Sequence, residues 1–279
     1  MLAAALAGAV AITVSLSLSL INGPDPEPRE RNESRAVTPA TEQAAERPDL
    51  PPRIERFTVG SGARAAIVVR PEGDGLRPAV IFLHGFGQSA FENYAGWIRH
   101  LARRGNTVIA PRYQLDTGSA PDRYLPDAIA GIRAALERSP VEPESLVVVG
   151  HSAGAALAVD YAAVAAQESL PEPRAVFAVY PGRALLDFPG GIPAEDESRI
   201  APETRLVALA GAGDQVVGEG PAAEIVEQAT SIPPERRELI RVTDPAVSDH
   251  YGPERSTQSA RDAFWKPLDE LIRVARRDG

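Results

Sequence analysis

Short continuous apolar runs alternate with longer helical patterns along residues 53–279, and this alternation restricts the fold more than any other feature. Runs such as 80–83 and 146–149 have no polar face, which is typical of strands buried on both sides in a parallel sheet. Eight strands are predicted, at residues 56–59, 65–69, 79–83, 107–110, 146–149, 175–180, 206–210 and 238–242. Five helices are predicted, at residues 91–104, 126–138, 153–166, 222–228 and 256–276. The pattern therefore predicts an α/β fold with a doubly wound, mostly parallel eight-stranded sheet and helices on both faces.

The N-terminal residues have a different composition. Residues 2–21 carry no charged side chain and are mostly Ala, Leu, Val and Ile. A helix of about 20 such residues is long enough to cross a bilayer core. Two interpretations of residues 1–22 stay open, a signal peptide and an uncleaved membrane anchor. Either one predicts an extracytoplasmic protein, secreted or tethered to a membrane by this segment.

Residues 23–52 separate this segment from the folded part. Seven prolines alternate there with charged and small polar residues: Pro24, Pro26, Pro28, Pro39, Pro48, Pro51 and Pro52. Such a stretch buries too little apolar area to offset the entropy of ordering it, so we expect a disordered linker. Residues 53–279 then form one domain of ordinary size.

Composition excludes several functions. The formal charge of −9 argues against nucleic-acid binding, which favours a concentrated basic face. Because the chain has no cysteine, it has no disulfide, thiolate metal site or cysteine nucleophile. The stretch 60–65 has the glycine spacing of a dinucleotide fingerprint, but a predicted strand follows it, so we interpret it as a hairpin turn. No histidine–carboxylate spacing indicates a metal, and we expect no cofactor.

The strongest motif is Gly150-His151-Ser152-Ala153-Gly154, directly between a predicted strand and an Ala-rich helix. A serine at the tip of such a sharp turn needs small neighbours, and the helix N-terminus directs free N–H groups toward its side chain. This pattern predicts Ser152 as a nucleophile.

A serine nucleophile needs a neighbouring base. His151 lies within the turn, where we expect its side chain to point away from Ser152. His100 lies in a predicted amphipathic helix, and His84 precedes a glycine after a strand. His250 lies in a loop between the last predicted strand and the final helix, so it is the predicted base.

The base in turn needs an acid that orients it. Asp214 follows a predicted strand through three small residues, which places it on a loop at the carboxyl end of that strand. Asp187 and Asp249 are the alternatives, but the side chain of Asp249 should diverge from that of the adjacent His250. With Asp214 as the acid, the chain order is Ser, Asp, His.

Two further groups complete the predicted site. The segment 84–87 is glycine-rich and follows a strand, so the Phe86 N–H paired with the Ala153 N–H is the predicted oxyanion hole. Tyr113 follows another strand at its carboxyl end, where ligands gather, and is a candidate substrate-binding residue.

These motifs together resemble the α/β-hydrolase superfamily, in order, across most of residues 53–279. The chain looks most like dienelactone-hydrolase-like and polyester-hydrolase-like serine esterases, although dienelactone hydrolases have cysteine at the position of Ser152. The resemblance implies Ser152 as nucleophile, His250 as base, Asp214 as acid, and Phe86 and Ala153 as oxyanion donors. The segment 181–204, where lids enter in this superfamily, is too short for a large lid domain, so we expect an open site.

The expected function is the hydrolysis of a small-molecule or polymeric carboxylic ester through an acyl-enzyme. Two alternatives stay open. One is a peptidase or amidase, because the same three side chains cleave amides. The other is a catalytically silent binding module on a hydrolase scaffold.

Overall fold

The computed structural model describes residues 52–87, 92–142, 144–185 and 187–277. All the residues that the structure describes belong to one compact unit, 49–279. The predicted N-terminal segment 1–22 lies outside the described residues, as does the predicted linker 23–52 apart from Pro52. Among the residues that are described, none of the helices has the length and apolar character needed to span a membrane.

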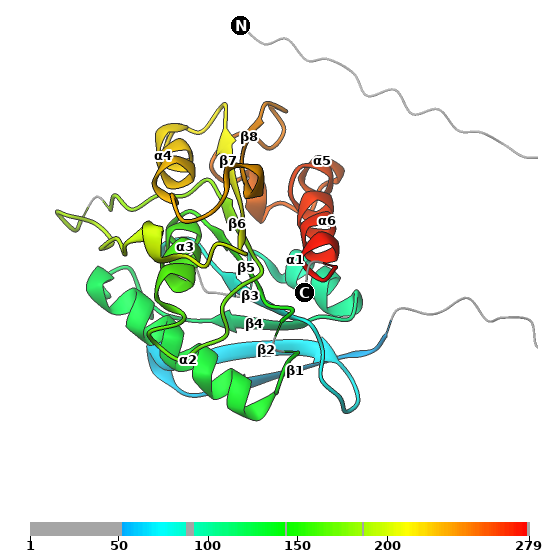
Figure 1. Cartoon of the computed structure of the whole chain (residues 1–279). Coiled ribbons are helices and arrows are strands. Elements are labelled where there is room, and N and C mark those ends of the chain that lie inside the picture. The colour runs from blue at the N-terminus through cyan, green and yellow to red at the C-terminus, as the bar shows by residue number, and fades with distance from the viewer. Residues whose placement is uncertain (1–51, 88–91, 143, 186, 278–279) are drawn as a thin grey trace, which may run out of the picture. The chain divides into compact units, whose positions relative to one another are not determined.

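The eight predicted strands form one sheet (Figure 1). Its order is β1-β2-β4-β3-β5-β6-β7-β8. β1 pairs with β2, and β2 with β4, in antiparallel fashion, while all other neighbours are parallel. The strands are β1 Ile54–Val59, β2 Ala66–Pro71, β3 Ala79–Leu83, β4 Thr107–Pro111, β5 Val147–His151, β6 Ala175–Val179, β7 Arg205–Gly211 and β8 Arg237–Val242. The predicted α/β fold with a mostly parallel sheet is confirmed.

Helices cover both faces of this sheet (Figure 1). α2, α3 and α4 lie on one face, where their apolar side chains share one core cluster. α1 and α6 lie on the other face with a second cluster, which includes Trp97 and Leu268. The helices are α1 Ala95–Arg103, α2 Tyr124–Arg138, α3 Ala153–Val164, α4 Gly220–Gln228, α5 Gln258–Ala260 and α6 Lys266–Ala275.

The predicted helix 256–276 is interrupted. Between α5 and α6, residues Arg261–Trp265 form a π-helical turn in which the Lys266 N–H bonds to the Arg261 carbonyl. Pro267 follows directly and has no N–H for the preceding turn, so the helix widens at this point.

The segment between β6 and β7 is short, as expected. Its one helical piece among the described residues is the 3₁₀ turn Glu197–Arg199. No large lid is present in the described part of this segment.

Candidate active site

The turn between β5 and α3 holds Ser152 in a strained backbone conformation, with φ 55° and ψ −122°. The two glycines of the motif are sterically required. A Cβ on Gly150 would lie 2.0 Å from the Gly154 carbonyl oxygen, and a Cβ on Gly154 would lie 2.3 Å from the carbonyl oxygens of Leu83 and His84. The motif therefore packs the turn tightly against the end of β3, with Ser152 at its tip.

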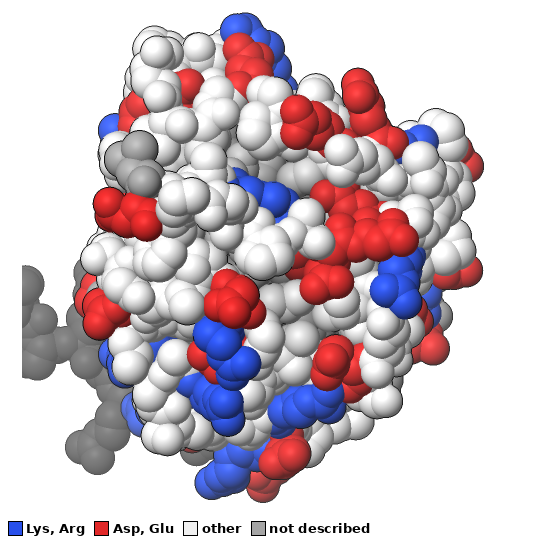
Figure 2. Space-filling view, turned by 90° about the vertical axis from the view of Figure 1, so that its left-hand side faces the viewer, with Lys and Arg blue, Asp and Glu red and all other residues white. Residues whose placement is uncertain are grey.

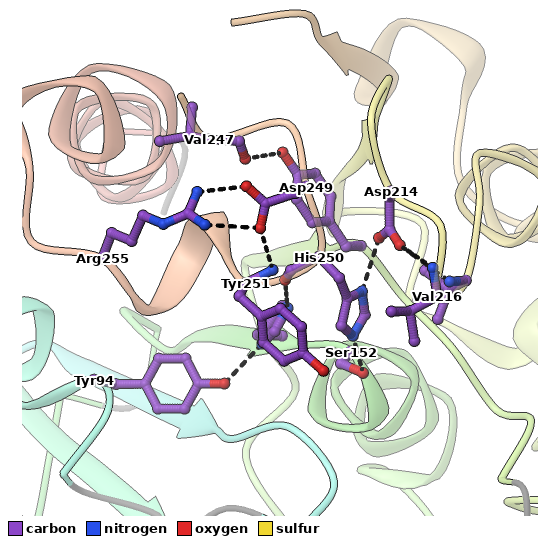
Figure 3. A network of polar contacts seen from close by, with 12 residues as sticks. Tyr94, Ser152, Asp214, Val216, Val247, Asp249, His250, Tyr251 and Arg255 are labelled. Carbon is purple, nitrogen blue, oxygen red and sulfur yellow. Dashed lines mark hydrogen bonds and ion pairs between the residues drawn. The ribbon is translucent and has the colours of Figure 1, made fainter. Parts of the chain in front are cut away.

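Three side chains from separate parts of the chain meet at this turn (Figure 3). The Ser152 hydroxyl lies 2.9 Å from His250 Nε2, and His250 Nδ1 lies 2.8 Å from Asp214 Oδ2. Asp214 is on the loop after β7, and His250 is on the loop after β8. Ser152 is 9% exposed, while His250 and Asp214 are buried behind it. The geometry allows Ser152 to donate to His250 and His250 to donate to Asp214.

Backbone donors hold Asp214 in place. Its Oδ1 accepts the N–H groups of Val216 and Val217 at 2.8 and 3.1 Å. Burial alone raises the pKa of the Asp214 carboxyl, but the hydrogen bonds from His250 and these two amides outweigh it, so the pKa lies below its ordinary value. Asp214 is therefore an ionised, oriented acceptor near neutral pH.

The two alternative acids have other surroundings. Asp249 forms a two-pronged ion pair with Arg255, at 2.5 and 2.9 Å, which fixes the loop that carries His250. Asp187 is exposed in the segment after β6. The structure thus brings Asp214, rather than either alternative, to the base.

The two predicted oxyanion donors lie at the start of α3 and on the loop after β3. Ala153 is the first residue of α3, where an N–H has no acceptor within its own helix. Phe86 is half-buried after β3, and a Cβ on its neighbour Gly85 would lie 3.5 Å from the Ser152 Cβ. The loop after β3 therefore passes directly beside the nucleophile position.

Tyr113 does not lie on a surface open to substrate. It is fully buried, its ring stacks on His84 with centroids 4.2 Å apart, and its hydroxyl donates to the His84 carbonyl. The positive φ of 38° turns this side chain inward, away from the sheet edge where we expected it. Tyr113 supports the loop that carries Phe86, and the expected substrate contact is corrected accordingly.

Sequence reasoning missed a buried polar chain behind Ser152. The Gly85 N–H donates to the Tyr94 hydroxyl at 3.1 Å, and Tyr94 donates to His151 Nδ1 at 2.7 Å. His151 Nε2 in turn donates to the His250 carbonyl at 2.8 Å. Burial lowers the pKa of His151 to about 3, so the ring is neutral, as this pattern of donors requires. The chain connects the loop after β3 with the loop that carries His250.

Apolar side chains border the site. Val216 is 61% exposed beside Asp214, and Tyr251 is 55% exposed beside His250 (Figure 3). The Tyr251 ring meets the His250 ring edge-on, with centroids 5.6 Å apart. In the part of the chain that the structure describes, no three acidic or histidine side chains group as a metal site requires.

Comparisons with known proteins agree with this architecture. A family model described as an alpha/beta hydrolase fold matches residues 80–213. A putative dienelactone hydrolase from Klebsiella pneumoniae subsp. pneumoniae is 20% identical, with a TM-score of 0.58, over 79% of this chain and 99% of that chain. An esterase from Rhizomucor miehei is 16% identical, with a TM-score of 0.61, over 82% and 87%. An esterase from Pyrobaculum calidifontis is 17% identical, with a TM-score of 0.57, over 80% and 85%.

No curated protein sequence matches the chain significantly. The strand order, the family model and the structural neighbours nevertheless agree on one fold. The chain therefore has the α/β-hydrolase fold.

Proposed function

We propose that this protein hydrolyses carboxylic esters through an acyl-enzyme formed on Ser152. One observation carries the proposal: an unbroken hydrogen-bonded chain runs from Asp214 through His250 to Ser152, at a strained turn beside the first N–H groups of α3. A serine hydroxyl becomes a nucleophile when an oriented base accepts its proton, and this chain supplies such a base.

In the first half of the reaction, Ser152 Oγ attacks the ester carbonyl carbon while its proton moves to His250 Nε2. The ionised Asp214 stabilises the resulting imidazolium through the bond at Nδ1. The N–H groups of Ala153 and Phe86 stabilise the oxyanion. When the tetrahedral intermediate collapses, the C–O bond to the alcohol breaks and His250 protonates the departing oxygen.

In the second half, water replaces the alcohol. His250 accepts a proton from the water as its oxygen attacks the acyl carbonyl, and then returns a proton to Ser152 Oγ as the acyl–serine bond breaks. The products are a carboxylic acid and free enzyme.

Two features favour esters of modest size over peptides. Val216 and Tyr251 offer apolar surface at the rim, and the described part of the segment after β6 adds no domain that would select a peptide. The structural neighbours from Rhizomucor miehei and Pyrobaculum calidifontis are themselves named as esterases.

The test is hydrolysis of short-chain p-nitrophenyl esters and matched anilides by the purified protein. We expect ester turnover that disappears in Ser152→Ala and persists in Ser61→Ala, a control at an exposed serine in the turn between β1 and β2. Equal ester turnover in Ser152→Ala and in the control would contradict the proposal, and faster cleavage of the anilides would replace the esterase with an amidase.

A further inference from the structure

A cavity of about 330 Å³ lies on the face of the molecule that carries α3 and α4, close to the segment after β6. Figure 2 shows this face, with a hollow that holds a basic side chain and has acidic side chains along its border. Most of its wall is apolar, formed by Ala156, Pro181, Ala184, Ala194, Pro221 and Ile225. The charged side chains that line it are Arg183, Glu197 and Glu224.

The positive charge in the cavity is already compensated. Arg183 donates two hydrogen bonds to the carboxylate of Asp160, at 2.8 and 2.7 Å, and Asp160 is fully buried on α3. The Glu195 N–H also donates to Asp160, at 3.0 Å. The pair is neutral as a whole, so Glu224, together with Glu197 when it is ionised, leaves the cavity with a negative balance.

Glu197 has an unused acceptor. The residue is 6% exposed, and its Oε2 is buried without a hydrogen-bond partner among the described residues. Its other oxygen lies 3.9 Å from the Arg183 guanidinium. Buried polar atoms in native proteins are nearly always paired, so this oxygen points to a donor that comes from outside the chain.

We propose that this cavity binds an alkylammonium group, with its N–H donors on Glu197 Oε2 and its alkyl chain along the apolar wall. A cavity of this size holds a chain of a few carbon atoms, and a carboxylate is the acceptor that an ammonium group favours. Because Arg183 is already paired with Asp160, it attracts an anionic ligand only weakly.

The cavity lies near the backbone of the residue that carries the nucleophile. Gly182 lines it, and the Gly182 N–H donates to the Ser152 carbonyl at 3.2 Å. Ala156 lies one helical turn from Ser152, which is about 6 Å along the axis. The alkylammonium group can therefore belong to an ester substrate, a reading that rests on the proposed function, or to a separate small amine.

Binding is tested first, without any catalytic readout. The protein is titrated with n-butylammonium and with n-butanol, its neutral counterpart, and followed by NMR. We expect n-butylammonium to shift signals of the cavity lining at about millimolar concentration, as its few atoms allow. Glu197→Gln should weaken this binding about tenfold or more, because one charged hydrogen bond is lost. Glu227→Gln, on the same helix as Glu224 but outside the cavity, should bind normally.

The pH dependence adds a second readout. The pKa of Glu197 is raised to about 7, and burial is the largest cause. The charge of Arg183 opposes this increase, while the charges of Asp160 and Glu224 add to it. Since only the ionised carboxylate attracts the cation fully, affinity should rise as the pH increases through 7 and should be flat in Glu197→Gln. Binding of n-butanol as tight as that of n-butylammonium, or unchanged cation affinity in Glu197→Gln, would overturn the proposal.

A kinetic comparison then identifies the source of the group. The methyl esters of 6-aminohexanoic acid and of heptanoic acid differ in an ammonium and a methyl group at the chain end. If the group belongs to the substrate, kcat/KM favours the amino ester at least fivefold, and this preference is lost in Glu197→Gln and retained in Glu227→Gln. Cation binding without such a preference supports a separate amine ligand. Absence of hydrolysis of both esters, with cation binding intact, would contradict the proposed function and leave the binding site standing.

Discussion

His151 Nε2 lies 2.8 Å from the backbone carbonyl oxygen of His250, so the residue before the nucleophile holds the loop that carries the base. The other nitrogen of the same ring accepts from Tyr94, which holds the Gly85 N–H beside the predicted oxyanion loop. One neutral imidazole thus connects two loops that are distant in sequence. The proposed reaction requires these loops to keep fixed positions relative to each other.

Tyr94→Phe should impair both stability and turnover. The substitution leaves the Gly85 N–H and His151 Nδ1 without their buried partner, which costs about 1–3 kcal/mol of unfolding free energy. Because the loop positions then loosen, we expect kcat to fall more than KM rises. Urea denaturation and steady-state ester kinetics measure the two effects.

Tyr161→Phe is the matched control for this variant. Tyr161 is also buried, and its hydroxyl donates to the Pro171 carbonyl at 3.0 Å, away from the site. This control should lose stability without losing kcat. A similar loss of kcat in both variants would mean that Tyr94 acts only through global stability.

Asp214→Asn should lower kcat by about 10⁴-fold, as the loss of an orienting carboxylate does in serine hydrolases, with a folded protein. Asp249→Asn is the comparison, because Asp249 holds the same loop through Arg255 but does not contact the base. We expect it to lower kcat less than tenfold. Single-turnover kinetics on a p-nitrophenyl ester measure both, and equal losses would refute the assignment of Asp214 as the acid.

Glu197 should make stability fall as the pH rises. Its pKa is raised from its ordinary value of 4.5 to about 7, so the folded state binds a proton that the unfolded state releases between these values. The stabilisation of the folded state by this bound proton is complete below pH 4.5 and is lost by about pH 7. With partial screening by solvent, the loss is about 1–2 kcal/mol.

Urea denaturation between pH 4.5 and 7.5 measures this slope. In Glu197→Gln the side chain no longer titrates, and the difference between variant and parent should reproduce the decline. A variant curve parallel to the parent curve would show that other groups cause the pH dependence.

Gly154→Ala should prevent the turn from packing. Its Cβ would meet the carbonyl oxygens of Leu83 and His84 at 2.3 Å, where backbone cannot give way easily. We expect a loss of at least about 1–3 kcal/mol together with loss of ester hydrolysis. Gly220→Ala is the control, because nothing lies within 4 Å of its Cβ position, and it should be neutral or slightly stabilising. Thermal denaturation compares the two, and a Gly154→Ala variant as stable as the control would contradict the steric account.

Much of the fold follows from local pattern. The continuous apolar runs of β3 and β5 predict buried strands because both faces of a central strand are covered. The motif around Ser152 predicts a sharp turn because only glycine fits at 150 and 154. Loop position likewise favours Asp214 and His250, whose side chains lie within hydrogen-bond distance of each other.

The rest depends on contacts that leave no local pattern. Tyr113 follows a strand end, as many ligand-binding residues do, but its left-handed backbone turns the ring into the core against His84. Tyr94 and His151 are 57 residues apart, and no spacing connects them. Glu197 is one acidic residue among many in the sequence, and only the packing of its segment on α3 buries it.

The central claim is that Ser152 Oγ carries the acyl group. Treatment of the protein with a fluorophosphonate, followed by proteolysis and mass spectrometry, tests this directly. We predict one modified peptide, with the adduct on Ser152, and protection by a competing ester substrate. An adduct on any other residue, or none in a protein that hydrolyses esters, would contradict the account.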